Sequence, residues 1–100
     1  MFSAINRIEI KAEHAAEVDQ LFQRNAELMK QCDGFLALHL MSPDGNPNSR
    51  AVMALWRSRD DYEAYKKSDI FRQTHAGINP TWFMGPPKVE RLDVVYSLSV

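Results

Sequence analysis

The chain has 100 residues, of which 45% are hydrophobic and 25% charged, and its formal net charge at pH 7 is −1. This composition is typical of a single globular domain with one hydrophobic core, residues 1–100, and excludes a disordered chain. No segment gathers Lys and Arg on one face, so nucleic acid and anionic membranes have no electrostatic basis as partners.

Cellular location is indicated by three features of the sequence. The N-terminal residues lack the basic leader and apolar segment of a signal peptide. No apolar stretch approaches the roughly 20 residues that a membrane span needs. Cys32 is the only cysteine, so it has no internal disulfide partner, and a reducing compartment suits it. We therefore expect a cytoplasmic protein without a membrane segment.

The first element is a strand over residues 2–10, where apolar and polar side chains alternate. One face of this strand carries Phe2, Ala4, Asn6, Ile8 and Ile10, and is apolar except at Asn6. The hydrophobic period then changes to that of a helix from about residue 13 to residue 32, and Asp33-Gly34 ends it.

The remaining elements are two strands, two short helices, a loop and a final strand. Ser58 and Ser68 are the expected N-caps of the short helices, and the first of these helices carries Tyr62 and Tyr65. Turn residues at 44–48 join the two middle strands into a hairpin. The predicted ranges are strands 35–41 and 50–57, a helix after Ser58, a helix over 69–76, an irregular loop over 78–87 and a strand over 89–100.

The order β-α-β-β-α-β predicts an α+β, ferredoxin-like fold with a four-stranded antiparallel sheet and helices on one face. The other face is also apolar, because Ile5 and one of the two alternating sets in strand 50–57 point that way. An exposed apolar face of this size needs a cover. We therefore expect a homodimer whose sheets pack face to face as a dimeric α/β barrel.

The segment Ala54–His75, together with Asn6-Arg7-Ile8 and Asp33-Gly34-Phe35, resembles the antibiotic biosynthesis monooxygenase superfamily. The similarity is greatest to its IsdG-type haem-degrading monooxygenases. This resemblance implies an enzyme that binds haem through an axial histidine, oxygenates the porphyrin ring and releases iron. Haem would then be substrate and cofactor, with electrons from an external donor, an unidentified reductase.

The resemblance also implies roles for particular residues. The axial ligand of the haem iron falls on His75, and the distal asparagine falls on Asn6. The family's pocket tryptophan falls on Tyr65, a departure that bears on how strongly a bound haem would be distorted and on which product forms. Apart from the resemblance, Arg24 on the first helix is a candidate contact for the haem propionates, although a solvated helix charge is the favoured interpretation.

Each of these residues also has a purely structural interpretation. His75 lies near a helix C-terminus, which a protonated imidazole favours, although a neutral imidazole on an apolar wall is a good haem ligand. The amide of Asn6, among apolar neighbours, either bonds to nearby backbone or donates to activated oxygen. Tyr65 is explained by core filling, and Arg24 by a solvated helix charge.

Two other functions remain open from the sequence. A cofactor-free monooxygenase would act on a quinol or an aromatic polyketide, with Asn6 and Trp56 shaping the pocket and His75 incidental. A non-catalytic haem-binding dimer would bind the same ligand without turnover. The sequence has no Cys/His zinc cluster, phosphate-binding glycine loop or Gly-x-Ser-x-Gly motif, so redox chemistry requires a cofactor or a reactive substrate.

Overall fold

The computed structural model describes residues 1–100 and has the predicted βαββαβ order, with two consecutive helices in the second crossover. No helix in it is both long and apolar enough to cross a membrane. The strands are β1 (Phe2–Glu9), β2 (Phe35–Met41), β3 (Ser49–Trp56) and β4 (Lys88–Asp93). The α-helices are α1 (Ala15–Ala26), α2 (Arg59–Lys66) and α3 (Asp69–Thr74).

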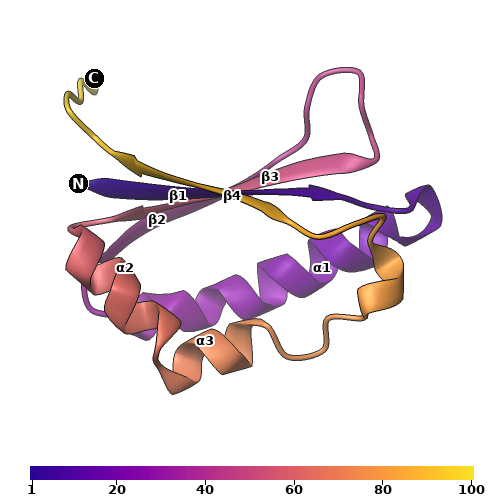
Figure 1. The fold of residues 1–100 in the computed structure, drawn as a ribbon, viewed down its shortest axis with the longest axis horizontal. Coiled ribbons are helices and arrows are strands. Elements are labelled where there is room, and N and C mark those ends of the chain that lie inside the picture. The colour runs from indigo at the N-terminus through magenta and orange to yellow at the C-terminus, as the bar shows by residue number, and fades with distance from the viewer.

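The four strands form one antiparallel sheet in the order β2-β3-β1-β4. All three α-helices lie against the same face of this sheet (Figure 1). The fold is therefore the ferredoxin-like α+β fold that the sequence predicts. Asn6 of β1 lies opposite Val52 of β3 and Val89 of β4, so these three residues share the helix-facing side of the sheet.

The hydrophobic core is divided into two clusters. The larger core cluster consists of Phe2, Ala4, Met29, Trp56, Tyr62 and Tyr65. The smaller core cluster consists of Ile8, Ile10 and Val18. Along the helix-facing row of β1, Asn6 stands between Ala4 and Ile8, which is where the two clusters part.

The predicted caps of the short helices are confirmed. Ser58 Oγ accepts a hydrogen bond from the Asp61 backbone N–H at 3.2 Å, and Ser68 Oγ accepts one from Phe71 at 3.3 Å. The predicted helix 13–32 is less regular, because α1 is flanked by 3₁₀ helices at Ala12–His14 and Glu27–Gln31. The loop 78–87 contains a further 3₁₀ helix at Pro80–Trp82.

The prediction of a strand over 89–100 is wrong in its second half, since β4 ends at Asp93. The cause is the length of its neighbour. Asp93 pairs with Phe2, the first residue of β1, and the Val94 N–H then bonds the Met1 carbonyl. Beyond Val94 the sheet offers no backbone partner within this chain, and residues 95–100 are exposed.

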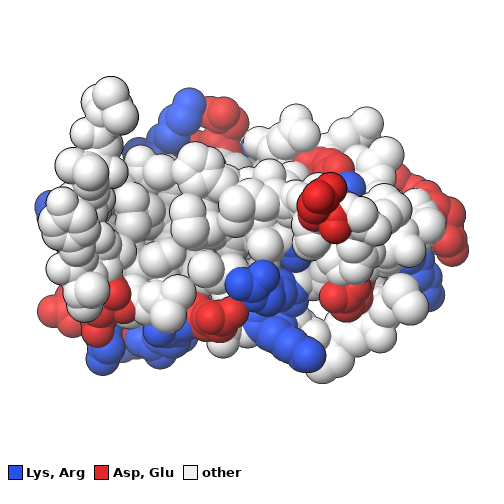
Figure 2. Space-filling model, turned by 90° about the horizontal axis from the view of Figure 1, so that it is seen from above, with Lys and Arg blue, Asp and Glu red and all other residues white.

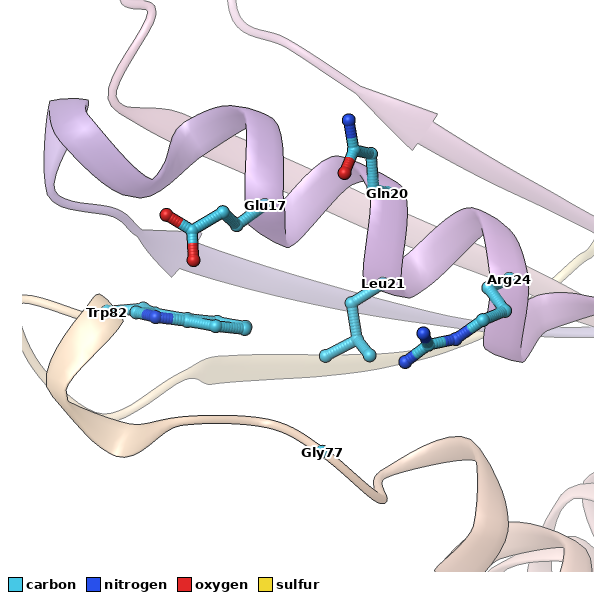
Figure 3. Close-up of a pocket in the computed structure, with 6 residues that line it drawn as sticks. All are labelled: Glu17, Gln20, Leu21, Arg24, Gly77 and Trp82. Atoms are coloured by element: carbon cyan, nitrogen blue, oxygen red, sulfur yellow. The ribbon is translucent and has the colours of Figure 1, made fainter.

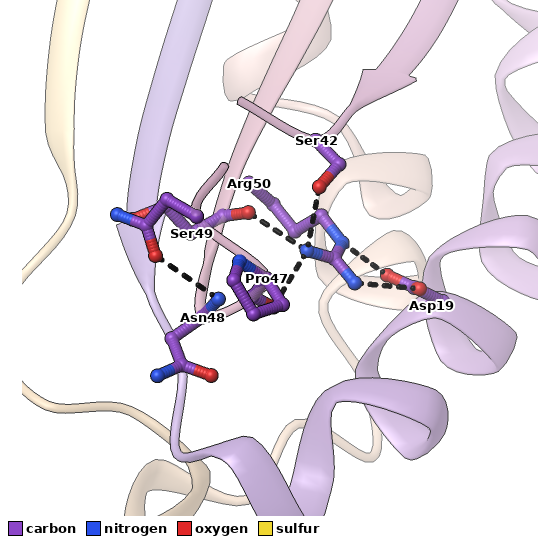
Figure 4. Close-up of polar contacts among 7 residues, drawn as sticks. Asp19, Ser42, Pro47, Asn48, Ser49 and Arg50 are labelled. Carbon is purple, nitrogen blue, oxygen red and sulfur yellow. Dashed lines mark hydrogen bonds and ion pairs between the residues drawn. The ribbon is translucent and has the colours of Figure 1, made fainter. Parts of the chain in front are cut away.

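The β2–β3 hairpin is fastened to α1 by Arg50, whose side chain is only 12% exposed. Its guanidinium donates two hydrogen bonds to the Asp19 carboxylate, at 2.9 and 3.1 Å (Figure 4). The same group also donates to the backbone carbonyls of Pro47 and Ser49 and to Ser42 Oγ. A bidentate ion pair between Arg50 and Asp19 thus holds α1 against the β2–β3 hairpin.

The sheet face away from the helices is uncharged over its middle and charged around its rim (Figure 2). Its side chains alternate with the helix-facing row of β1, so Ile5 and Met53 form one pair on it. Leu55 and Leu92, both opposite Ser3, form its neighbouring row. The predicted apolar outer face is present in these two rows, although Glu90, the neighbour of Ile5 on β4, and Arg7 place an ion pair on the same face.

Candidate functional site

A cavity of about 520 Å³ lies between the sheet and the helices, and five of the six residues of the larger core cluster line it. Hydrophobic residues make up 13 of the 20 that line it. A mostly apolar hollow of this volume, with a few polar groups, is typical of a small-molecule site. Three of the predicted site residues line it, namely Asn6, Tyr65 and His75.

His75 terminates α3, and hydrogen bonds fix the orientation of its ring. Its Nδ1 lies 2.8 Å from the Phe71 carbonyl oxygen and 3.1 Å from Thr74 Oγ1. Because a carbonyl oxygen only accepts, Nδ1 carries the proton in the neutral imidazole and Nε2 keeps its lone pair. The ring also packs on Phe71, with centroids 4.2 Å apart. His75 is an exposed residue at the cavity wall, so its free nitrogen is accessible to a ligand.

Asn6 lies on β1, where its neighbours along the helix-facing row, Ala4 and Ile8, are both core residues. Its Oδ1 is buried and makes no hydrogen bond. Leaving a buried acceptor unpaired costs about 1–3 kcal/mol. The structural interpretation of Asn6 predicted a hydrogen bond from its side chain to nearby backbone, but Oδ1 makes no such bond. An unpaired amide in an apolar cavity is a group available to a ligand.

Tyr65 and Trp56 form one wall of the cavity, and both also belong to the larger core cluster. Their ring centroids are 5.0 Å apart. The Tyr65 hydroxyl is hydrogen-bonded to Thr74 Oγ1 at 2.8 Å. Burial raises the pKa of Tyr65 above its ordinary value, against a smaller opposite effect from this hydrogen bond. Trp56 Nε1 is buried without a partner.

Arg24 lies elsewhere, in a second cleft of about 290 Å³ between α1 and the loop that follows α3 (Figure 3). In this cleft its neighbours include Glu17 and Trp82. The basic residues that line the larger cavity are Lys66 and Arg91. Sequence reasoning missed both, because the approach of β4 to α2 is a tertiary contact without a local sequence signal.

Two further residues that the sequence analysis missed support the end of α3. The buried Asn25 amide donates hydrogen bonds to the backbone carbonyls of Thr74 and Ala76, at 3.0 and 3.1 Å. The spacing of the helix could have identified Asn25 as a buried residue, because it places Asn25 on the same buried face as Val18 and Met29. A polar residue on such a face needs a partner. Thr74 had no comparable signal.

Comparisons with known proteins give a consistent result. The family model described as antibiotic biosynthesis monooxygenase matches residues 1–77. A heme oxygenase (staphylobilin-producing) from Staphylococcus saprophyticus is 26% identical over 105 residues, covering 99% of this chain and 100% of that protein.

No group of three or more His, Cys, Asp or Glu side chains is placed to hold a metal ion.

Two solved structures have the same fold. The heme-degrader MhuD from Mycobacterium tuberculosis, solved with two hemes bound in its active site, is 23% identical, has a TM-score of 0.80, and covers 99% of this chain and 100% of that one. SnoaB from Streptomyces nogalater, a cofactor-independent oxygenase, is 18% identical with a TM-score of 0.82, covering 97% of this chain and 95% of that one. The fold thus occurs in oxygenases with and without haem.

Proposed function

Because this chain belongs to the antibiotic biosynthesis monooxygenase family, we propose that it is a haem-degrading monooxygenase of the IsdG type. It binds haem through His75 and oxygenates the porphyrin ring, and ring opening releases iron. The observation that carries this proposal is the meeting of His75, with Nε2 free, and the unpaired Asn6 amide in one apolar cavity. The similarity to a heme oxygenase over almost the whole chain supports it.

The residues of the cavity fit haem. A flat apolar macrocycle suits a mostly hydrophobic cavity, and a neutral imidazole nitrogen suits its iron. The two haem carboxylates suit basic residues, and Lys66 and Arg91 line the cavity. Asn6 and Trp56 line the cavity, and their Oδ1 and Nε1 atoms are buried without hydrogen-bond partners, which supports an occupant with polar groups.

The roles of the residues follow from their positions. Bound haem supplies the iron that activates oxygen and the ring carbon that is oxygenated. His75 would hold the iron through Nε2, and the Nδ2–H of Asn6, rather than its unpaired Oδ1, would donate the hydrogen bond that orients oxygen without supplying a proton prematurely. The Tyr65 and Trp56 rings form the wall against which a flat ligand rests. Arg24 remains a predicted propionate contact, and a separate reductase supplies the electrons.

The proposal is tested by titrating the protein with haemin and following the absorbance of the haem. We expect a shifted Soret band with the wild-type protein, and its loss in His75→Ala. His14→Ala is the matched control, because His14 lies against Trp82 and does not line the cavity. An unchanged spectrum in His75→Ala refutes the ligand assignment.

Turnover is tested separately, by adding a mild reductant in air to the haem complex. Bleaching of the haem absorbance supports the proposed degradation. Haem binding without bleaching would identify the non-catalytic haem-binding alternative.

A second candidate function is cofactor-free oxygenation of a quinol. It is favoured by the unpaired groups themselves, because Trp56 Nε1 is a donor and Asn6 Oδ1 an acceptor, which together match a hydroxylated aromatic ring. The wild-type protein would then consume oxygen with a quinol in the absence of haem, and His75→Ala would retain this activity. That result would support a cofactor-free quinol monooxygenase.

The outer sheet face is proposed to be covered by a second copy of the chain. That face is largely uncharged away from its rim (Figure 2), and Ile5, Met53 and Leu55 lie on it, as in an interface with an apolar core and a polar rim. The exposed segment 95–100 adds further apolar side chains, including Val95, Tyr96 and Leu98. Two sheets packed face to face would bury both.

A further inference from the structure

Tyr65 is connected to His75 through the side chain of Thr74. Tyr65 lies on α2 and His75 ends α3, and Thr74 Oγ1 is 2.8 Å from the Tyr65 hydroxyl and 3.1 Å from His75 Nδ1. We propose that Tyr65 and Thr74 are positioning residues, which hold His75 in the tautomer with its proton on Nδ1 and its lone pair on Nε2. This inference rests on the proposed function in one respect, the use of Nε2 as a ligand.

The directions of the hydrogen bonds follow from the number of protons. The Phe71 carbonyl oxygen accepts from Thr74 Oγ1 at 2.9 Å and lies 2.8 Å from His75 Nδ1. The Thr74 hydroxyl has one proton, and the bond to Phe71 uses it. With the Thr74 proton on the Phe71 carbonyl, which also accepts the His75 backbone N–H at 3.3 Å, we assign Tyr65 as the donor in its bond to Thr74. Nδ1–H is then the donor toward both Phe71 and Thr74.

The Tyr65 donor matters because the Thr74 hydroxyl can otherwise rotate. Once Oγ1 accepts from Tyr65, its own proton is directed to the Phe71 carbonyl and not to His75 Nδ1. Without that donor, the Thr74 hydroxyl can turn to Nδ1 and compete with the Phe71 carbonyl, and each molecule in which it donates to Nδ1 carries the imidazole proton on Nε2. That tautomer has no lone pair for a metal at the nitrogen that faces away from the helix.

Both residues are held rigidly enough for this role. The Tyr65 ring lies between Trp56, at 5.0 Å, and the edge of Phe71, at 5.3 Å. The Thr74 backbone is anchored by Asn25, which bonds its carbonyl oxygen. Fixed second partners of a ligating histidine commonly determine its tautomer and ring orientation.

The direct test is the tautomer of His75 in the ¹⁵N-labelled protein without haem, read from the ¹⁵N chemical shifts of its ring above the pH at which imidazole ordinarily titrates. We expect protonated Nδ1 and unprotonated Nε2 in the wild-type protein. In Tyr65→Phe, which keeps the ring and removes the hydroxyl, the Nε2 signal should move toward the protonated position. An unchanged pair of shifts in Tyr65→Phe overturns the proposal.

Tyr62→Phe is the matched control, because Tyr62 lies on the same helix in the same core cluster and takes no part in this network. Its His75 shifts should equal those of the wild-type protein. Thr74→Val removes the one hydroxyl that could donate to Nδ1, so it should keep the wild-type shifts, and adding Thr74→Val to Tyr65→Phe should restore them. A merely structural role of Tyr65 predicts no difference between Tyr62→Phe and Tyr65→Phe in this measurement.

Haemin titration of the same variants separates the two proposals. Loss of a hydrogen-bond partner of a ligating histidine typically weakens metal binding roughly 10-fold or more, and we expect this for Tyr65→Phe but not for His14→Ala, at a residue outside the cavity. If the wild-type protein does not bind haemin, the proposed function fails while the tautomer result stands. If haemin binds equally to all variants and the tautomer is unchanged, the positioning role fails while the proposed function stands.

Discussion

The Asn25 side-chain amide donates a hydrogen bond of 3.0 Å to the carbonyl oxygen of Thr74, 49 positions later in the chain. A second bond from the same nitrogen reaches the Ala76 carbonyl at 3.1 Å. One buried amide thus connects α1 to the residues on either side of His75. The position of the candidate ligand depends on a helix that carries none of the predicted catalytic residues.

Replacement of Asn25 by Ala should lower the free energy of unfolding by about 1–3 kcal/mol, because two carbonyl groups lose their donor. Urea denaturation measures this. Gln23→Ala, at an exposed position of the same helix, should change the stability by less than about 0.5 kcal/mol. Equal effects of the two substitutions would contradict the role of the Asn25 amide.

Replacement of Asn6 by Val should have the opposite effect on the protein without ligand. The unpaired Oδ1 is removed from an apolar environment, so the free energy of unfolding should rise by about 1 kcal/mol. The same variant should lose oxygenation of haem. Asn25→Val, at an amide that is hydrogen-bonded, should destabilise. A loss of stability in Asn6→Val would show that its amide has a structural partner.

Two glycines allow backbone strain to be separated from a steric collision. Gly34 and Gly45 both have positive φ angles, 80° and 73°. A Cβ at Gly45 meets nothing within 4 Å, whereas a Cβ at Gly34 would collide with the Asp61 carboxyl group. Gly45→Ala should therefore cost about 1 kcal/mol, and Gly34→Ala clearly more. Equal losses in urea denaturation would mean that the Asp61 side chain moves aside freely.

Asp61 should make stability depend on pH in the acid range. Its pKa is held below the ordinary value by hydrogen bonds from Arg57 and then from Ser58, which outweigh the opposite effect of desolvation. A lowered pKa means that the unfolded chain binds this proton more readily. The stabilisation is complete above the ordinary aspartate pKa of about 3.9, and it is lost as the pH falls through the folded-state value.

The measurement compares Asp61→Asn with the wild-type protein in urea at neutral and at acid pH. The difference in stability should be largest at neutral pH and should shrink below about pH 4. Asp60→Asn, one position earlier on α2, provides the control. A difference that does not change with pH would assign the effect of Asp61 to uncharged contacts, such as its hydrogen bonds with Ser58, rather than to its ionisation.

The outer sheet face should mediate dimer formation, which analytical ultracentrifugation measures. We expect the wild-type mass to equal that of two chains. Leu55→Glu places a charge in the middle of this face and should yield the mass of one chain. Met84→Glu alters a residue that is 67% exposed, in the loop before β4, and should leave the mass unchanged. A wild-type monomer would contradict the proposal.

Much of the fold was predictable because local patterns and tertiary pairing agree. The alternation around Asn6 set the faces of β1, and Ser58 and Ser68 marked the starts of two helices where the structure has them. The end of β4 was not predictable in this way. Residues 94–100 look like a strand by composition, but a strand requires a neighbour, and β1 begins opposite Asp93.

The candidate site divides along the same line. Resemblance singled out Asn6, Tyr65 and His75, and the structure places all three along one cavity. It gave no indication that the Tyr65 hydroxyl would bond Thr74, because residues nine positions apart meet here only through the turn between α2 and α3. Arg24 was predicted as a haem contact, but it lines the smaller cleft and not the cavity that holds the other three residues.

Because the cavity lies against the hydrophobic core, the melting temperature should rise when a ligand binds in it. In a protein of this size, a hollow beside the larger core cluster leaves its lining side chains without packing partners until a ligand fills it. A guest at 100 times its dissociation constant adds about 2.7 kcal/mol to the folded state, and a 100-residue domain converts that into a rise of roughly 10 °C or more in melting temperature. Porphyrins and quinols can be ranked by the increase in melting temperature that each causes, and the largest increase would identify the ligand that the cavity binds best.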